Sequence, residues 1–359
     1  MPKCVLLDTH LCATLPGYYK PCCQYTKYAD IYQDVTLSEM SHKEYSQTPQ
    51  FQQIKKDMET GWHKGCEKCR LDETQNGIQS LRQLSNENFK SDLGIQFVEI
   101  SLSNNCNLSC KMCNTDSSSK WSNLYKTNPD LQHYFRDNNQ EISIERVFNG
   151  LDLSNLKVIK YLGGEPFITP QTKELFNFLE DQNIINNVQL TTNTNCTFFP
   201  HKWIKQLLKF KNVLIGLSLD GFKKSCEYSR TGSNWDELTK NVKYWAMLQK
   251  HHPKFNIQFS TTVNALTVHD YTNFINYANE VGLGYTPYVV HQPAYLKLEV
   301  LPPEYVNSIK DENNKQFLDN VVYDPELFEK FKKFIETTDR AQNINIRNYL
   351  PELAKYLDK

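Results

Sequence analysis

Two regions of the chain differ in how apolar residues recur along the sequence. From about residue 95 onward, short apolar runs rich in β-branched and aromatic residues alternate with longer stretches in which apolar residues recur every three or four positions. The first pattern is typical of buried strands and the second of amphipathic helices. The predicted strands are residues 95–102, 157–162, 187–192, 213–219, 255–263 and 285–290.

The longer stretches predict helices between these strands. They are residues 172–179, 202–210, 235–249 and 271–281. Strands that alternate with crossover helices form a parallel sheet, so the six strands predict an α/β fold with a partial (β/α)6 TIM-like barrel. Residues 303–357 are expected to add C-terminal helices. In such barrels the chemistry lies at the carboxyl ends of the strands.

The first 90 residues have no such regular pattern. We expect a short strand at 4–8, a turn rich in Gly, Pro and Tyr at 15–21, and helices at 50–60 and 71–84. A segment with so many loops usually needs a staple to fold. The sequence therefore predicts three parts: an irregular module at residues 1–90, the barrel at 91–300 and a helical extension at 301–359.

Composition and charge narrow the class of protein. The 359 residues carry 40 Lys and Arg against 41 Asp and Glu, so nucleic-acid binding by bulk charge is not indicated. No apolar run approaches the ~18 residues that span a bilayer, and the N-terminus lacks the continuous apolar stretch of a signal peptide. We therefore expect a cytoplasmic protein without a membrane partner.

The cysteines are numerous and unevenly distributed. Nine of the 11 fall within the first 113 residues. In a reducing compartment, clustered cysteines are more often metal ligands or catalytic groups than disulfides. The sequence therefore predicts at least one metal site in the first third of the chain.

Three of these cysteines form a compact motif directly after the first predicted barrel strand. Cys106, Cys110 and Cys113 stand as C-x3-C-x2-C in CNLSCKMC. Three thiolates can hold three irons of a cubane cluster and leave the fourth iron open. A closed zinc site needs four ligands, and the next histidine is His133. The alternatives are a loop of ordinary thiols and a zinc site with a distant fourth ligand.

This motif, together with two others, resembles the radical S-adenosylmethionine (SAM) superfamily. GGEP at 163–166 follows the second predicted strand. SLDG at 218–221 follows the fourth predicted strand, and Arg230 lies ten residues beyond Asp220. The resemblance covers roughly residues 95–292.

The resemblance implies a [4Fe-4S] cluster whose open iron binds SAM, which is cleaved reductively to a 5′-deoxyadenosyl radical that abstracts hydrogen from a substrate. It implies that the two glycines of GGEP let the backbone approach the methionine moiety of SAM. It also implies that Glu165 accepts from the ammonium group of SAM, that Arg230 pairs with the carboxylate of SAM and that Met112 lies near the adenine. Some of these residues have another interpretation: the two glycines as a turn, Arg230 as a solvated or ion-paired side chain, and Asn193 as part of a strand-end turn. The implied SAM-binding residues are Met112, Gly163, Gly164, Glu165, Asn193, Ser218, Asp220 and Arg230.

A second group of cysteines precedes the barrel. Cys12 and Cys22 flank Gly17 as C-x4-G-x4-C, and Cys66 and Cys69 form C-x2-C. Two such pairs can supply the four ligands of one metal site. The spacing resembles the SPASM module or its shorter form, twitch, although here the module precedes the barrel. That resemblance implies a second, auxiliary [4Fe-4S] cluster.

Some alternatives stay open for this front module. Two pairs of cysteines are also a zinc-ribbon pattern. Cys23 could replace Cys22 as the ligand, although Cys22 keeps the spacing from Gly17. Cys4 is expected to be an ordinary strand residue.

The resemblance implies a radical SAM enzyme that modifies a peptide or protein, or oxidises or epimerises a small molecule. It also implies an external reductant such as flavodoxin or ferredoxin. The sequence identifies no catalytic acid or base. The alternative from another class is a non-catalytic zinc-binding interaction protein with a degenerate barrel.

Overall fold

The computed structural model describes residues 2–15, 17–26, 40–137 and 141–358. These residues form two compact units, and each is described by itself. The first unit comprises Met1–Asn104, Gln140–Thr192 and Lys205–Val213, and the second comprises Asn105–Asn139, Asn193–Ile204 and Leu214–Lys359. The division at residues 90 and 300 stays a prediction, and residues 27–39 of the expected front module lie outside the described residues.

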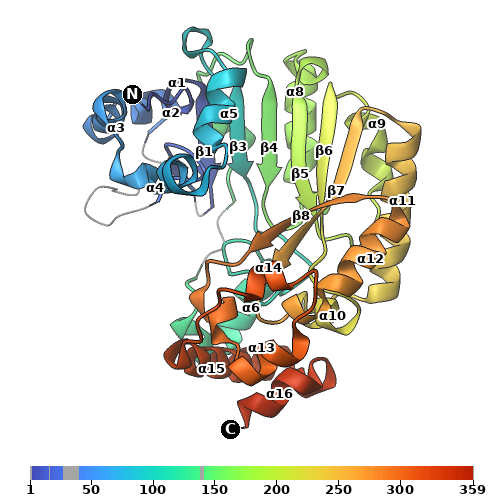
Figure 1. The fold of residues 1–359 in the computed structure, drawn as a ribbon. Coiled ribbons are helices and arrows are strands. Elements are labelled where there is room, and N and C mark those ends of the chain that lie inside the picture. The colour runs from blue at the N-terminus through green and yellow to red at the C-terminus, as the bar shows by residue number, and fades with distance from the viewer. Residues whose placement is uncertain (1, 16, 27–39, 138–140, 359) are drawn as a thin grey trace. The chain divides into compact units, whose positions relative to one another are not determined.

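The strands form an eight-stranded sheet in an α/β fold. Their order is β2-β1-β3-β4-β5-β6-β7-β8. All six strands predicted from the apolar runs are confirmed, with ends shifted by at most two residues. They are β3 (Phe97–Ser101), β4 (Val158–Leu162), β5 (Gln189–Thr194), β6 (Asn212–Ser218), β7 (Phe255–Val263) and β8 (Gly284–Val289), drawn in Figure 1.

Two further strands come from the front of the chain. β1 (His10–Thr14) pairs antiparallel with β2 (Tyr18–Lys20) and parallel with β3. Gly17 has a φ of 105°, which favours glycine in the turn of this hairpin. The front of the chain therefore extends the sheet, which the sequence did not predict.

The strand expected at residues 4–8 is wrong. That segment begins the short helix α1 (Leu6–Thr9) instead. Both the backbone N–H and the hydroxyl of Thr9 donate to the carbonyl of Val5, at 3.1 and 2.9 Å. These local bonds close a helical turn before the chain enters β1.

The helix expected at 50–60 is confirmed, and the one expected at 71–84 is wrong. α3 (Pro49–Thr60) has its N-cap at Thr48 and its C-cap at Gly61. The second stretch divides at Gly77, whose φ of 61° ends one helical segment, while the Ser80 hydroxyl accepts from the backbone N–H of Gln83 and opens the next. The other helices of the front part are α2 (His42–Ser46), α4 (Glu67–Leu71) and α5 (Leu81–Asn88).

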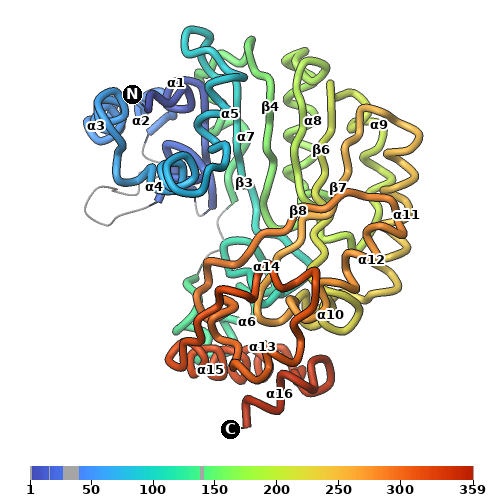
Figure 2. Tube along the Cα trace, viewed as in Figure 1, coloured from blue at the N-terminus to red at the C-terminus, as the bar shows by residue number. Residues whose placement is uncertain are grey.

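The predicted crossover and C-terminal helices are present. The 3-10 helix at Ala294–Leu296 and α15 pack against each other, and α15 also packs against the 3-10 helix at Pro129–His133. Figure 2 follows the chain from α13 to α16. The helices are α6 (Ser119–Thr127), α7 (Ile144–Phe148), α8 (Gln171–Asp181), α9 (Ile204–Leu207), α10 (Lys224–Ser229), α11 (Trp235–His251), α12 (Tyr271–Val281), α13 (Pro303–Ile309), α14 (Lys315–Leu318), α15 (Pro325–Gln342) and α16 (Pro351–Leu357). In the described part of the chain, no helix combines the length and apolar character that a membrane crossing requires.

Candidate functional site

The C-x3-C-x2-C motif lies in the second unit, in a loop that we call the cysteine loop (residues 106–113). Cys110 is buried, while Cys106 and Cys113 are half-buried. A turn brings the backbone N–H of Cys113 to the carbonyl of Cys110, at 3.0 Å. The hydrogen bond that the Cys110 thiol donates to Cys113 lowers the pKa of Cys113 and raises that of Cys110. The loop thus brings the Cys110 and Cys113 thiols together, and Cys106 lies near enough that its charge opposes ionisation of Cys113.

A buried ion pair adjoins this loop. Arg230 Nε lies 2.8 Å from Asp220 Oδ2, and Asp220 is fully buried. The two atoms meet without the alignment of a hydrogen bond, so the contact is an ion pair. Arg230 Nη1 lies 3.9 Å from Cys110 Sγ, and the positive charge of Arg230 favours the thiolate at both Cys110 and Cys113. This side chain can compensate the negative charge of a thiolate-bound cluster.

Asp220 also forms a hydrogen bond with a strand of the sheet. Its Oδ1 accepts from the backbone N–H of Thr262 in β7. Both carboxylate oxygens therefore have partners within the protein, one on a strand and one on Arg230. The structure places Asp220 as the residue that fixes Arg230.

Two asparagines lie at the carboxyl end of β5, Asn193 within the strand and Asn195 directly after it. Asn195, which the sequence reasoning missed, has its Nδ2 3.8 Å from Cys106 Sγ and 2.8 Å from Asn107 Oδ1. Asn193 lies over β6, where a Cβ on Gly216 would collide with its Oδ1. Asn195 therefore donates toward a cysteine of the triad, while Asn193 is a strand-end residue beside a glycine. Ser218 ends β6 and Met112 lies within the cysteine loop, and both are half-buried.

GGEP at 163–166 lies in the first unit, directly after β4. Gly163 has a φ of 149°, and a Cβ there would lie 2.6 Å from the carbonyl oxygen of Ser103. The backbone N–H of Gly164 donates to the same oxygen at 2.9 Å. Only glycine fits this close approach without displacing the backbone. The Glu165 side chain is buried, and its Oε1 accepts from the backbone N–H of Phe167 at 3.4 Å.

The front cysteines gather in the first unit, but not as the set that the spacing indicates. A small cavity, which we call the thiol cavity, is lined by Cys22, Cys66 and Cys69 as expected, and by Cys4 in place of Cys12. Gly65 lines it and packs closely against Tyr25, because a Cβ on Gly65 would collide with the ring of Tyr25. Arg82 also lines the cavity.

Burial dominates the electrostatics of the thiol cavity. It raises the pKa of Cys4 to about 11 and that of Cys66 to about 12, and it raises the pKa of Cys22 and Cys69 as well. The charge of Arg82 opposes this effect at Cys4. Thiols with raised pKa values bind a metal by releasing their protons, so these four cysteines are neutral without metal and become thiolates only when metal is bound.

Cys12 lies elsewhere in the same unit, in a row of polar side chains across the sheet. The strand register aligns Cys12 with Glu99 and Glu99 with Lys160. Glu99 pairs with Lys160 at 3.3 Å and accepts a hydrogen bond from the Cys23 thiol. Burial, followed by the nearby Glu99 charge, raises the pKa of Cys12 and of Cys23. Cys12 and Cys23 are therefore partners of Glu99, whereas Cys22 faces the thiol cavity.

One sequence signal points to Cys4, because it precedes the hairpin and belongs to the cysteine-rich front of the chain. Asn195 stands in no pattern that marks a contact with Cys106. Across the described residues, no group of three or more His, Cys, Asp or Glu side chains is arranged to hold a single metal ion.

Comparison with known protein families decides the family. Residues 100–278 match the model of the Radical SAM superfamily. The chain belongs to the radical SAM superfamily. The matched residues include the cysteine loop, GGEP and Arg230, while the thiol cavity and α15 lie outside them.

Several curated radical SAM proteins are similar to this chain. One is the radical SAM cyclopropyl synthase TigE of Paramaledivibacter caminithermalis, 28% identical over 187 residues, which are 50% of this chain and 38% of TigE. A GTP 3′,8-cyclase of Clostridium acetobutylicum is 25% identical over 190 residues, 51% of this chain and 54% of the cyclase. A cysteine-type anaerobic sulfatase-maturating enzyme of Clostridium novyi is 28% identical over 177 residues, 46% of this chain and 42% of the relative. This radical SAM protein therefore spans 38% to 54% of the length of these relatives.

Among solved structures, Streptococcus suis SuiB bound to its precursor peptide SuiA is similar to this chain. It is 15% identical, the match covers 86% of this chain and 63% of SuiB, and the TM-score is 0.37. SuiB bound to S-adenosylmethionine matches with 14% identity, 69% of this chain, 45% of SuiB and a TM-score of 0.36.

The close approach at Gly163 predicts a cost for any side chain there. We expect Gly163→Ala to lower the free energy of unfolding by roughly 1–3 kcal/mol, because alanine disfavours this φ and its Cβ would meet the Ser103 carbonyl. Chemical denaturation measures the difference. Gly61→Ala is the control, since Gly61 has no atom within 4 Å of its Cβ position and an ordinary extended φ. Equal effects of the two substitutions would contradict this account.

The Arg230–Asp220 pair predicts a second effect on stability. Asp220→Asn keeps an acceptor for Thr262 but leaves the buried guanidinium without a counter-charge, so we expect the free energy of unfolding to fall by about 3 kcal/mol. Glu329→Gln is the matched control, because its pair with Lys332 is exposed and contributes less than about 1 kcal/mol. Denaturation curves that shift by the same amount for both variants would show that the buried pair contributes no more to the free energy of unfolding than the control pair does.

Proposed function

We propose that this radical SAM protein is an enzyme that cleaves SAM reductively and uses the resulting radical to abstract hydrogen from a substrate. The observation that carries the proposal is the cysteine loop: three cysteines within one loop, with a buried arginine 3.9 Å from Cys110 Sγ. Three thiolates bind three irons of a [4Fe-4S] cluster, and Arg230 stabilises the bound thiolates. When bound, the cluster and SAM supply a 5′-deoxyadenosyl radical.

Residues around the strand ends would bind and orient SAM. Gly163 and Gly164 present backbone without side chains, which lets a ligand approach. Glu165 is a buried carboxylate, a group suited to accept from the ammonium group. The remaining proposed contacts are Arg230 on the carboxylate, Met112 near the adenine, and Asn193 and Ser218 on the ribose or carboxylate. Asp220 acts through Arg230 rather than on SAM.

We further propose that the first unit binds an auxiliary [4Fe-4S] cluster in the thiol cavity. Its ligands are Cys4, Cys22, Cys66 and Cys69, with Cys4 in the place that the spacing gives to Cys12. Four cysteines that line one cavity together with Arg82, one of them buried and three half-buried, support this set. The four cysteine sulfurs that hold a [4Fe-4S] cluster each bind a different iron, so they lie farther apart than the four ligands of a single zinc ion. With four cysteine ligands, this cluster would serve electron transfer and the fold of the loop-rich front.

The substrate is a peptide or protein side chain, or a small molecule that is oxidised or epimerised. The names of the curated relatives include both kinds of substrate, a sulfatase and GTP. An external flavodoxin or ferredoxin would supply the electron that SAM cleavage requires.

The cysteine loop generates the direct test of the activity. Replacing Cys106, Cys110 and Cys113 together with alanine should abolish 5′-deoxyadenosine formation from SAM with dithionite, because no iron remains to bind SAM. About four irons should stay in the thiol cavity. Undiminished 5′-deoxyadenosine from the triple variant would contradict the proposal, and colourless zinc-loaded wild-type protein would favour a non-catalytic metal-binding protein.

The choice between Cys4 and Cys12 is tested in the same background. With the triad replaced, Cys4→Ala should lose most of the remaining iron, whereas Cys12→Ala should keep it, because Cys12 faces Glu99 and not the cavity. Iron and sulfide analysis after anaerobic reconstitution measures both. Loss of iron in Cys12→Ala with retention in Cys4→Ala would restore the ligand set that the spacing indicates.

A further inference from the structure

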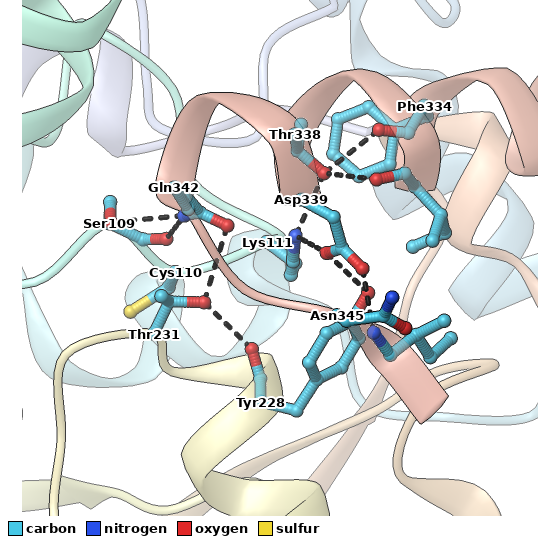
Figure 3. A network of polar contacts seen from close by, with 12 residues as sticks. Ser109, Cys110, Lys111, Tyr228, Thr231, Phe334, Thr338, Asp339, Gln342 and Asn345 are labelled. Carbon is cyan, nitrogen blue, oxygen red and sulfur yellow. Dashed lines mark hydrogen bonds and ion pairs between the residues drawn. The ribbon is translucent and has the colours of Figure 1, made fainter. Parts of the chain in front are cut away.

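A fully buried lysine lies between the second and third cysteines of the cysteine loop. The Lys111 side chain is 0% exposed, although lysines are almost never fully buried unless they are paired. Its ammonium group donates to Asp339 Oδ1 at 2.7 Å and to Thr338 Oγ1 at 2.8 Å (Figure 3). Both partners lie near the end of α15, outside the residues that match the superfamily model.

Asp339, the partner of Lys111, accepts further hydrogen bonds at both carboxylate oxygens. Asp339 Oδ1 also accepts from the hydroxyl of Tyr228 at 2.8 Å, and Oδ2 accepts from the backbone N–H of Ile346 at 2.7 Å. The ring of Tyr228 faces the Lys111 ammonium, which lies 4.8 Å from the ring centroid. The position of Asp339 is therefore fixed by α10 and by the chain after α15, so it can hold Lys111 in one place.

A second connection joins α15 to the same loop. Gln342, three residues beyond Asp339, donates from Nε2 to the carbonyl and the hydroxyl of Ser109, at 2.5 and 3.0 Å (Figure 3). Its Oε1 accepts from Thr231 Oγ1 at 3.4 Å. Ser109 and Lys111 are the two residues on either side of Cys110, so α15 grips the loop on both sides of a cysteine.

The loop backbone is bound from the other side as well. The N–H of Ser109 donates to the carbonyl of Thr231 at 3.1 Å, and the N–H of Lys111 donates to the carbonyl of Ser229 at 2.8 Å. These two carbonyls flank Arg230, the residue whose guanidinium lies beside Cys110. The segment 109–111 is thus held by the chain around Arg230 and by α15 together.

Stability alone does not explain a charged pair in this place. Replacing a buried ion pair by apolar side chains of similar volume is often neutral or stabilising, so such a pair is weak support for a purely structural role. The pair can instead act by restricting geometry. A charged, hydrogen-bonded contact specifies one arrangement of its partners, whereas apolar contacts tolerate several. A loop that must hold its thiols in one arrangement benefits from a contact that specifies its geometry.

We propose that α15 is part of the cluster site, with Lys111, Asp339 and Gln342 as positioning residues that hold the cysteine loop in the conformation that binds the cluster. This inference rests on the proposed function. It adds a component of the site from outside the matched residues, and it implies that changes in α15 alter the cluster without touching a ligand.

The test uses the full chain, reconstituted anaerobically with iron and sulfide, and three charge variants: Lys111→Met, Asp339→Asn, and the two combined. Each single variant leaves a buried charge without its partner, and should lower the thermal midpoint by roughly 10 °C. The double variant removes both charges and should regain most of that midpoint. It should still form 5′-deoxyadenosine about tenfold to a hundredfold more slowly than wild type, and show a different SAM-induced change in the EPR spectrum of the reduced protein.

An exposed ion pair of the same helix provides the matched control. Arg340 of α15 pairs with Asp130 at 2.9 Å, with side chains 68% and 62% exposed. The double variant Arg340→Met with Asp130→Asn removes a connection of α15 to the 3-10 helix at Pro129–His133 and leaves the contacts of α15 with the cysteine loop intact, so the midpoint, the EPR change and the rate should stay as in wild type.

Gln342→Met keeps the test decisive if the charge variants do not fold. It removes both bonds to Ser109 without leaving a buried charge, so we expect a slower rate and an altered EPR change at a near-wild-type midpoint. A double variant or Gln342→Met with wild-type rate and EPR change would overturn the proposal and leave α15 a purely structural element. If wild type binds iron at the triad but forms no 5′-deoxyadenosine, the proposed function fails. The EPR spectrum of the reduced triad cluster without SAM then still separates the variants.

Discussion

Negative charge placed among buried groups is the constraint on which both cysteine sites depend. A metal-bound thiolate carries charge, and burial raises the free energy of that charge unless a cation or a hydrogen-bond donor lies nearby. In the cysteine loop the compensation is direct, because Arg230 lies beside Cys110 and Asn195 points its amide toward Cys106. Asp220 keeps Arg230 in place by pairing with it. The loop can therefore hold thiolates where water cannot stabilise them fully.

The front cysteines meet the same constraint in another way. Burial raises the pKa values of their thiols. Among the described residues that line the cavity, Arg82 is the one cation. Such thiols stay protonated until a metal displaces the protons. Metal binding and ordering of this loop-rich segment would then be coupled, as the lack of regular pattern in the first 90 residues suggests.

The sequence predicted the barrel part well, because its strands are continuous apolar runs and its helices have a clear period. The GGEP glycines could also be predicted, since Gly163 occupies a backbone position that excludes a Cβ. The front was harder: local bonds from Thr9 to Val5 turn an expected strand into helix α1, and Cys4 reaches the thiol cavity from there. Spacing along the chain favoured Cys12, but strand register directs Cys12 toward Glu99. The Lys111–Asp339 contact joins residues 228 positions apart, and no local pattern marks such a pair.

The central claim is that the triad leaves one iron open for SAM. Pulsed EPR of the reduced protein, with SAM labelled by 15N at the amino group and 17O at the carboxylate, tests it most directly. The account predicts hyperfine couplings from both labels to the cluster held by Cys106, Cys110 and Cys113, which direct coordination of the open iron would produce. A reduced cluster that shows no coupling to either label at saturating SAM would contradict it.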